Sequence, residues 1–244
     1  MRAGEAMTEM QRFEIGGLFD MLGEGGLIVI APHPDDESLA CGGLIAEAWA
    51  TGRPVTVIVV SDGTGSHPRS RIYPRARLRA LRESEARHAV SALGPPPRCI
   101  KFLRLPDRFV PSQGVAARAA VDEIVTAAKQ INASALFVSW RHDPHCDHEA
   151  AYGLARAAQS ALGVALYEYS VWGAALKSSA RVAPVTAGFR LPVARHRARK
   201  RRAIAAHRSQ TTGMIADDPT GFRLSRADLM RFAGPFENFI ASDK

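Results

Sequence analysis

The sequence has few cysteines, almost no lysine and no long apolar segment. Its 244 residues include only three cysteines, and this small, odd number excludes a disulfide framework and fits a reducing compartment. Strictly apolar stretches such as 57–60 fall far short of the ~20 residues that span a bilayer. The N-terminus carries Glu5 and Glu9 without an apolar core, unlike a signal peptide. We therefore expect a cytoplasmic protein without a transmembrane segment.

The near absence of lysine contrasts with a large excess of arginine. The 32 basic residues comprise 27 arginines and five lysines, against 24 acidic residues, and arginines concentrate at 69–87 and 195–202. Such clusters bind nucleic acid or anionic surfaces, or form the solvated face of a helix. Neither zinc-finger nor helix-turn-helix spacing is present in the sequence. We expect solvated helices here and no nucleic-acid partner.

Short apolar segments alternate with longer amphipathic ones along the chain. The predicted strands are 27–31, 55–60, 99–105, 135–140 and 164–172, and the predicted helices are 38–51, 75–93, 115–130, 149–162, 195–208 and 226–232. Ser38 is the expected N-cap of the first helix. This alternation predicts βαβ units and a mostly parallel sheet with helices on both faces. The expected fold is a single α/β domain over 1–244, in which 181–192 is the loosest segment.

The loop after the first predicted strand is rich in carboxylates and contains no glycine. A dinucleotide-binding protein would have G-x-G-x-x-G here, but the chain has PHPDDE over 32–37, whose carboxylates would repel a phosphate. His33 and Asp36 are three residues apart across a turn and can face one point, which suits a zinc-type ion, while Asp35 diverges from them. Alternatively, Asp35 or Asp36 simply caps the next helix.

A second polar loop follows the strand predicted at 135–140, and three of its eight residues are histidines (RHDPHCDH, 141–148). Both loops lie at carboxyl ends of predicted parallel strands, and therefore on one rim of the sheet. His145 and His148 are three residues apart, so the two loops together can supply three metal ligands and a spare acid–base pair. Cys146 points away from the face of His145 and is not expected to be a ligand. The two clusters together predict a catalytic metal centre.

These two loops resemble the motifs of the LmbE/PIG-L family of zinc-dependent N-acetyl-sugar deacetylases. The family motif (A/P)HPDDE matches 33–37, and HPDH matches 145–148 with Cys146 in place of proline. Weaker matches are an R-x-x-E-A helix at 82–86, an LPD loop at 105–108 and an SQ element at 209–210. The resemblance covers about 27–210 in the family's order. It implies a three-layer α/β/α Rossmann-like fold with a mostly parallel sheet.

The resemblance also implies a ligand set for the metal. By position, His33, Asp36 and His148 would hold one Zn²⁺ ion per chain, although other divalent ions would also fit such ligands. Three protein ligands leave a coordination position open for water, as in catalytic zinc sites.

The remaining motif residues receive catalytic or binding roles by the same resemblance. Asp35 would be the general base, and His145 would stabilise the oxyanion and serve as the acid. Asp147 would orient the ring of His145, and Arg82 would contact the substrate. The implied activity is hydrolysis of an N-acetyl or other N-acyl group on a small amino sugar or glycoconjugate, by a chain that could form a homo-oligomer.

Two other functions compete with this interpretation. The first is a two-metal hydrolase of another ester or amide, because Asp143-x-His145-x-Asp147-His148 partly matches the H-x-H-x-D-H frame of metallo-β-lactamase-type sites. The number of metal ions per chain would separate these readings. The second is an arginine-rich binder of nucleic acid or an anionic surface, with a vestigial metal site. Salt-sensitive binding without metal-dependent hydrolysis would favour it.

Overall fold

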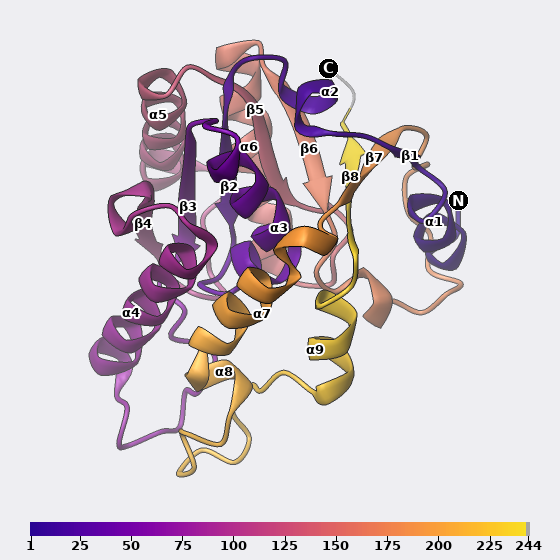
Figure 1. Ribbon diagram of the computed structural model, residues 1–244. Helices are drawn as coiled ribbons and strands as arrows, with labels where there is room; N and C mark the ends of the chain where they lie inside the picture. Colours follow the sequence, from indigo (N-terminus) through magenta and orange to yellow (C-terminus); the bar gives the residue numbers. More distant parts are fainter. Residues whose placement is uncertain (243–244) are drawn as a thin grey trace.

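The computed structural model describes residues 1–242 and has one eight-stranded sheet at its centre (Figure 1). Its strands are β1 (Glu14–Ile15), β2 (Gly26–Ala31), β3 (Val55–Ser61), β4 (Ile100–Leu105), β5 (Ala133–Ser139), β6 (Ala165–Tyr169), β7 (Gly188–Pro192) and β8 (Phe236–Ala241). Their order in the sheet is β1-β7-β8-β6-β5-β2-β3-β4. Strand β8 runs antiparallel to β6 and β7, and the other pairs are parallel. The expected mostly parallel α/β sheet is confirmed.

Helices cover both faces of this sheet. One face is covered by α2 (Leu18–Leu22), α3 (Asp36–Ala50), α4 (Arg75–Leu93) and α7 (Arg197–Ala206), and the other by α5 (Gly114–Gln130) and α6 (Cys146–Leu162). Figure 1 shows α3, α4 and α7 in front of the sheet. The shorter helices are α1 (Ala3–Met10), α8 (Arg208–Thr211) and α9 (Arg226–Phe232). The three-layer α/β/α arrangement is therefore confirmed.

The alternating side chains of β2 explain why both faces are covered. Leu27 and Val29 pack into the core on the α3 side, whereas Ile28 and Ile30 pack into the core on the α5 and α6 side. All six residues of the strand are buried. A strand that is apolar on both faces needs a helical layer on each of them.

The structure corrects several predicted boundaries. Helix α3 begins at Asp36 with Asp35 as its N-cap, so the cap assigned to Ser38 was wrong. Ser38 instead donates its hydroxyl to Glu37. Helix α6 begins at Cys146 rather than 149, because the ring of His145 caps it by accepting the Asp147 N–H. Both polar loops therefore run directly into the first turn of a helix.

Several short elements escaped sequence prediction. They are α1, β1, α2, β7 and β8, and β7 lies at the end of the segment that we expected to be loosest. The strand predicted over 164–172 ends at Tyr169. Among the described residues, no helix is both long enough and apolar enough to cross a membrane.

The sheet order places the two polar loops side by side. Strand β2 pairs with β5 in parallel, with Ile30 opposite Val138, so the loops after both strands leave the sheet at the same level. Strands β3 and β4 continue the sheet beyond β2, whereas β6 continues it beyond β5. The order of connection thus reverses between β2 and β5, and this is where ligands bind in open α/β sheets.

Candidate metal centre and active site

A cavity of about 170 Å³ opens at this reversal point. Sequence motifs that are far apart in the chain meet in its wall. The residues that line it are His33, Asp35, Asp36, Gly65, Ser66, Arg82, Asp107, Arg108, His145, Trp172, Gln210 and Phe222. The cavity therefore unites the HPDDE loop, the second histidine loop, the helix bearing Arg82, the LPD loop and the SQ element.

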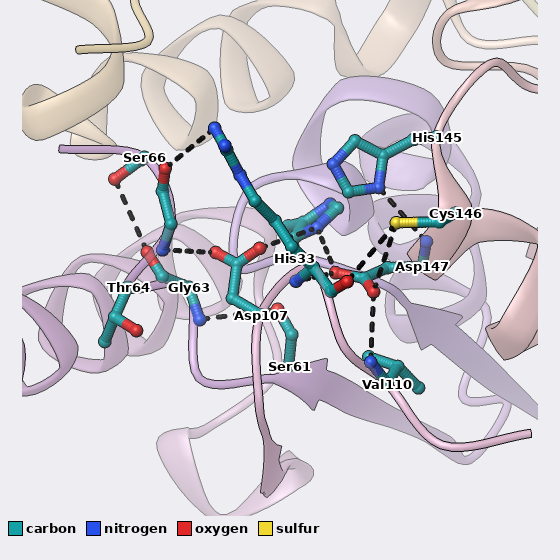
Figure 2. Close-up of polar contacts among 12 residues, drawn as sticks. His33, Ser61, Gly63, Thr64, Ser66, Asp107, Val110, His145, Cys146 and Asp147 are labelled. Carbon is teal, nitrogen blue, oxygen red and sulfur yellow. Dashed lines mark hydrogen bonds and ion pairs between the residues drawn. The ribbon is translucent and has the colours of Figure 1, made fainter. Parts of the chain in front are cut away.

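Three imidazoles surround a common point beside this cavity, and Figure 2 shows two of them, His33 and His145. The ring centroid of His33 lies 4.5 Å from that of His145 and 5.3 Å from that of His148. The rings of His145 and His148 are 5.5 Å apart. One nitrogen from each ring lies within 4.8 Å of the others, a spacing at which the three residues could hold a metal ion.

Asp36 faces two of these rings from the first turn of α3. Its Oδ2 atom lies 3.3 Å from Nδ1 of His33 and 3.4 Å from Nε2 of His148, and it also accepts the backbone N–H of His33 at 2.9 Å. Burial alone would raise the pKa of Asp36, but His148 and His33 hold it well below its ordinary value. Asp36 is therefore a carboxylate aimed at the imidazole cluster.

His148 is held in place by Asp143, which the sequence analysis included only in the frame of the two-metal alternative. Oδ2 of Asp143 lies 3.1 Å from Nδ1 of His148 and accepts the backbone N–H groups of Val171 and Trp172 at 2.7 and 3.1 Å. The other ring nitrogen, Nε2, is buried and has no hydrogen-bond partner within residues 1–242. A carboxylate on one ring nitrogen and an unpartnered second nitrogen is the arrangement found in metal-ligating histidines. The site therefore fits a metal ion.

The carboxylates around His33 also favour a metal ion at this site. Nε2 of His33 lies 3.2 Å from Asp147 and 3.5 Å from Asp107. Burial opposes a charge on the ring, yet contacts with Asp107, Asp147 and Asp36 raise the pKa of His33 well above its ordinary value. Such an excess of carboxylates favours a cation at this point, which a metal ion can supply in place of a proton.

Asp35 stands apart from the imidazoles, as the sequence predicts. Oδ1 of Asp35 lies 3.3 Å from Nη2 of Arg82, which is buried and also donates to the carbonyls of Gly63 and Pro34 at 2.8 and 3.3 Å. Burial raises the pKa of Asp35, Arg82 opposes this shift, and Asp36 adds to it. The carboxyl group thus combines access to the cavity with a raised proton affinity, which suits a general base.

Asp147 has different partners from those expected. Its carboxylate accepts the backbone N–H groups of Arg108 and Val110 at 2.7 and 3.2 Å and contacts His33 rather than the ring of His145. His145 uses Nδ1 to accept the backbone N–H of Asp147 at 3.2 Å, as Figure 2 shows. Burial and the imidazoles of His33 and His148 lower the pKa of His145, and they outweigh the carboxylates of Asp147 and Asp36, which oppose this shift. The neutral ring therefore carries its proton on Nε2.

Other lining residues had weak signals in the sequence or none. Asp107 and Gln210 belong to the LPD and SQ elements, which resembled the family without an assigned role. Trp172 and Phe222 lie outside every motif, yet their rings meet edge to face at 5.7 Å in the cavity wall. Only the folded chain brings these aromatic side chains to the site.

The family can now be named from the sequence comparison. The family model described as PIG-L, GlcNAc-PI de-N-acetylase, matches residues 28–159. This chain belongs to the PIG-L family. A relative from Nocardia farcinica (strain IFM 10152), 1D-myo-inositol 2-acetamido-2-deoxy-alpha-D-glucopyranoside deacetylase, is 49% identical over 39 residues. That match spans 16% of this chain and 13% of the relative.

Solved structures with the PIG-L chain's fold include proteins with more than one activity. N,N'-diacetylchitobiose deacetylase from Pyrococcus horikoshii is 19% identical, with a TM-score of 0.66 over 96% of this chain and 89% of its own. The zinc-inhibited form of teicoplanin deacetylase Orf2 is 19% identical, with a TM-score of 0.66 over 89% and 98% of the two chains. GalB from Pseudomonas putida KT2440, a 4-carboxy-2-hydroxymuconate hydratase, is 15% identical, with a TM-score of 0.67 over 90% and 97%. The shared fold alone therefore does not decide the reaction, which has to be argued from the site.

Proposed function

We propose that the chain is a zinc-dependent amidohydrolase that removes the N-acetyl group, or another N-acyl group, from an amino-sugar-containing small molecule or glycoconjugate. The observation that carries the proposal is the buried Nε2 of His148, which has no hydrogen bond within residues 1–242 and lies 3.4 Å from the carboxylate of Asp36, next to Asp35 in the chain. We assign the activity to one domain spanning 1–244. The three free cysteines are what a reducing compartment allows, and we place the enzyme in the cytoplasm.

His33, Asp36 and His148 would hold the metal ion. When bound there, a divalent ion lowers the pKa of water and polarises the acyl carbonyl. Two residue groups of the structure could hold an ion, one with His33, His145 and His148 and one with His33, Asp107, His145 and Asp147, and they share His33 and His145. Because of this overlap we propose one ion per chain, and two ions per chain would favour the two-metal alternative.

Asp35 performs the proton transfer in this proposal. Its carboxylate takes a proton from the water that attacks the acyl carbonyl, and the protonated Asp35 then gives this proton to the leaving nitrogen as the C–N bond breaks. The products are a carboxylate, acetate for an acetyl group, and a free amine. The raised pKa of Asp35 makes its carboxylate a better proton acceptor than an exposed aspartate would be.

His145 would stabilise the oxyanion of the tetrahedral intermediate as a neutral donor. Because its Nδ1 accepts the Asp147 N–H, the proton of the neutral ring is on Nε2 and can be donated. Asp147 acts indirectly in this account: it fixes the backbone of 108–110 and the ring of His33. The sequence-based expectation was that Asp147 orients the ring of His145, whereas its carboxylate contacts His33.

The cavity supports a sugar substrate. At about 170 Å³ it is smaller than the ~300–1,000 Å³ of pockets for drug-sized ligands, which suits one acylated ring rather than a whole conjugate. Trp172 and Phe222 offer an apolar wall for a ring face, and Arg82 and Gln210 offer polar groups. The rest of a larger conjugate would extend out of the cavity.

The test is acetate release from a panel of N-acetylglucosamine derivatives by chelator-treated protein, with and without added Zn²⁺ or another divalent ion. Graded additions of Zn²⁺ are needed because a zinc-inhibited form of a related structure exists. We expect acetate only in the metal-loaded arms and none from Asp35→Asn. Acetate formation that is unaffected by chelation, or its absence from every arm, would overturn the proposal.

A further inference from the structure

Arg108 has a backbone conformation that favours glycine. Its φ is 69°, in the left-handed region that residues with a Cβ atom adopt rarely. Arg104, with a φ of 57°, is a second arginine of this kind in the same segment. Glycine would adopt this backbone conformation more easily. An arginine at such a position therefore indicates that its side chain has a role.

The backbone contacts of Arg108 do not supply that reason. Its N–H donates to Asp147 at 2.7 Å and its carbonyl accepts the Cys146 thiol at 3.5 Å. Both contacts use main-chain atoms that glycine also has. Arg104 differs, because its guanidinium donates to Glu83 at 2.7 and 3.0 Å and holds β4 to α4.

The guanidinium of Arg108 lies at the cavity with most of its donors unused. Nη2 donates to the carbonyl of Gly65 at 3.2 Å, and Arg108 has no ion pair with a carboxylate within residues 1–242. The other arginine in the cavity wall, Arg82, is buried and engaged by Asp35 and two carbonyls. Arg108 is exposed and therefore free to meet a ligand.

The cavity wall combines buried carboxylates with an exposed arginine. Asp36 and Asp107 line the cavity, and His33 contacts both of them. Arg108 lines it as well, and its guanidinium contacts the Gly65 carbonyl in the loop between β3 and α4. An exposed guanidinium beside a cluster of carboxylates and imidazoles suits a ligand that is neutral at its reacting amide and anionic elsewhere.

We propose that Arg108 forms a subsite for an anionic group, phosphate or carboxylate, on the substrate. The substrate class is then an acidic N-acyl amino sugar, and this inference rests on the proposed deacetylase function. A guanidinium binds either anion through two parallel N–H donors, so an arginine binds it more tightly than a shorter or uncharged side chain does.

The test compares neutral and acidic substrates in matched variants. The neutral substrate is methyl N-acetylglucosaminide, and the acidic ones are N-acetylglucosamine 1-phosphate and N-acetylmuramic acid, which separate phosphate from carboxylate. We expect wild-type kcat/KM to be at least about 10-fold higher for one of the acidic sugars, as a charge-assisted hydrogen bond allows. Arg108→Gly and Arg108→Gln should abolish this preference, because they lower kcat/KM for the acidic sugar far more than for the neutral one, whereas Arg104→Gln should retain it.

Binding provides a second readout that does not need turnover. Calorimetry on Asp35→Asn, alone and combined with Arg108→Gln, should show the same loss of preference for the acidic sugar, and 0.5 M salt should weaken that preference in the single variant. If no sugar is deacetylated but the acidic one still binds through Arg108, the proposed function fails and the subsite stands. Equal wild-type affinity for acidic and neutral sugars would overturn the subsite. An equal loss for both sugars in the Arg108 variants, with a lower melting temperature, would make Arg108 structural and overturn it as well.

Discussion

Helix α3 contributes to two buried charged clusters that differ in one respect. At its middle, Glu237 accepts the backbone N–H groups of Gly43 and Leu44 at 2.6 and 2.8 Å and the Lys200 ammonium at 2.7 Å. At its N-terminus, Asp36 faces His33 and His148, and one buried nitrogen of His148 has no hydrogen-bond partner within 1–242. The first cluster contains its own cation, and the second has carboxylates in excess. The difference supports the proposal that the second cluster binds a cation from outside the chain.

Asp35→Asn should cause the largest loss of activity among the variants that leave the cluster at the N-terminus of α3 intact. Asp35 lies beside the imidazoles rather than among them, so the variant should keep its metal and lose activity by about 10²–10⁴-fold, as expected for removal of a general base. Metal content and kcat on one protein preparation check this. A variant with near-normal kcat would show that Asp35 does not transfer the proton.

Lys200→Met removes the cation from the cluster at the middle of α3, where Lys200 pairs with Glu237. Lys200 and Glu237 are both almost fully buried, and removing one partner of a buried ion pair typically costs about 3–5 kcal/mol of unfolding free energy. Urea unfolding should show this loss, while metal content per folded chain stays unchanged. The double variant Lys200→Met/Glu237→Gln is the matched control and should recover part of the lost stability. A single variant as stable as wild type would mean that the cluster does not depend on its internal cation.

His145→Ala separates a donor from a ligand. We expect kcat to fall by about 10²–10³-fold, the usual result of losing one oxyanion donor, with the metal retained. His145 also stands close enough to His33 and His148 to be a ligand itself. Loss of the metal from this variant would therefore reassign His145 from the oxyanion to the metal.

Glu83→Gln should change stability least, because Glu83 pairs with an arginine that is exposed at the surface. Hydrogen bonds from Arg104 lower the pKa of Glu83, although Arg104 is 54% exposed and solvent weakens the pair. A carboxylate with a lowered folded-state pKa stabilises the protein above its unfolded pKa of ~4.3 and loses that contribution as the pH falls through the folded value. The variant should thus lose about 0.2–1 kcal/mol at pH 7, and the difference from wild type should shrink below pH 4. An undiminished difference at low pH would show that the charge of Glu83 is irrelevant.

The sequence predicted the parallel part of the sheet well because its strands are buried on both faces. The segments that became β2 and β3 are continuous apolar runs, and the α4 and α9 boundaries match the prediction. Strands β7 and β8 escaped prediction because they are partly exposed, and because β8 pairs with β6 and β7 from the far end of the chain. No local pattern encodes that pairing.

The sequence predicted the site residues that belong to its motifs. It did not predict the contacts that form only when the chain folds. His33, Asp35, Asp36 and Arg82 meet at the cavity, and His148 lies beside it, as expected from two loops on one rim. The pairing of Asp147 with His33 was not predictable, because it depends on how the loop at 106–110 folds over α6. Likewise, Asp143 finds its role only through the backbone that follows β6.

The most direct test of the central claim is the metal content of wild type and His148→Ala, measured by elemental mass spectrometry after loading with Zn²⁺ and desalting. The account predicts one ion per wild-type chain and almost none in the variant, with the far-ultraviolet circular dichroism of both unchanged because the sheet core does not include this side chain. Glu237→Gln serves as the control from the other cluster and should keep its ion. Full metal occupancy in His148→Ala would contradict the assignment of the metal centre.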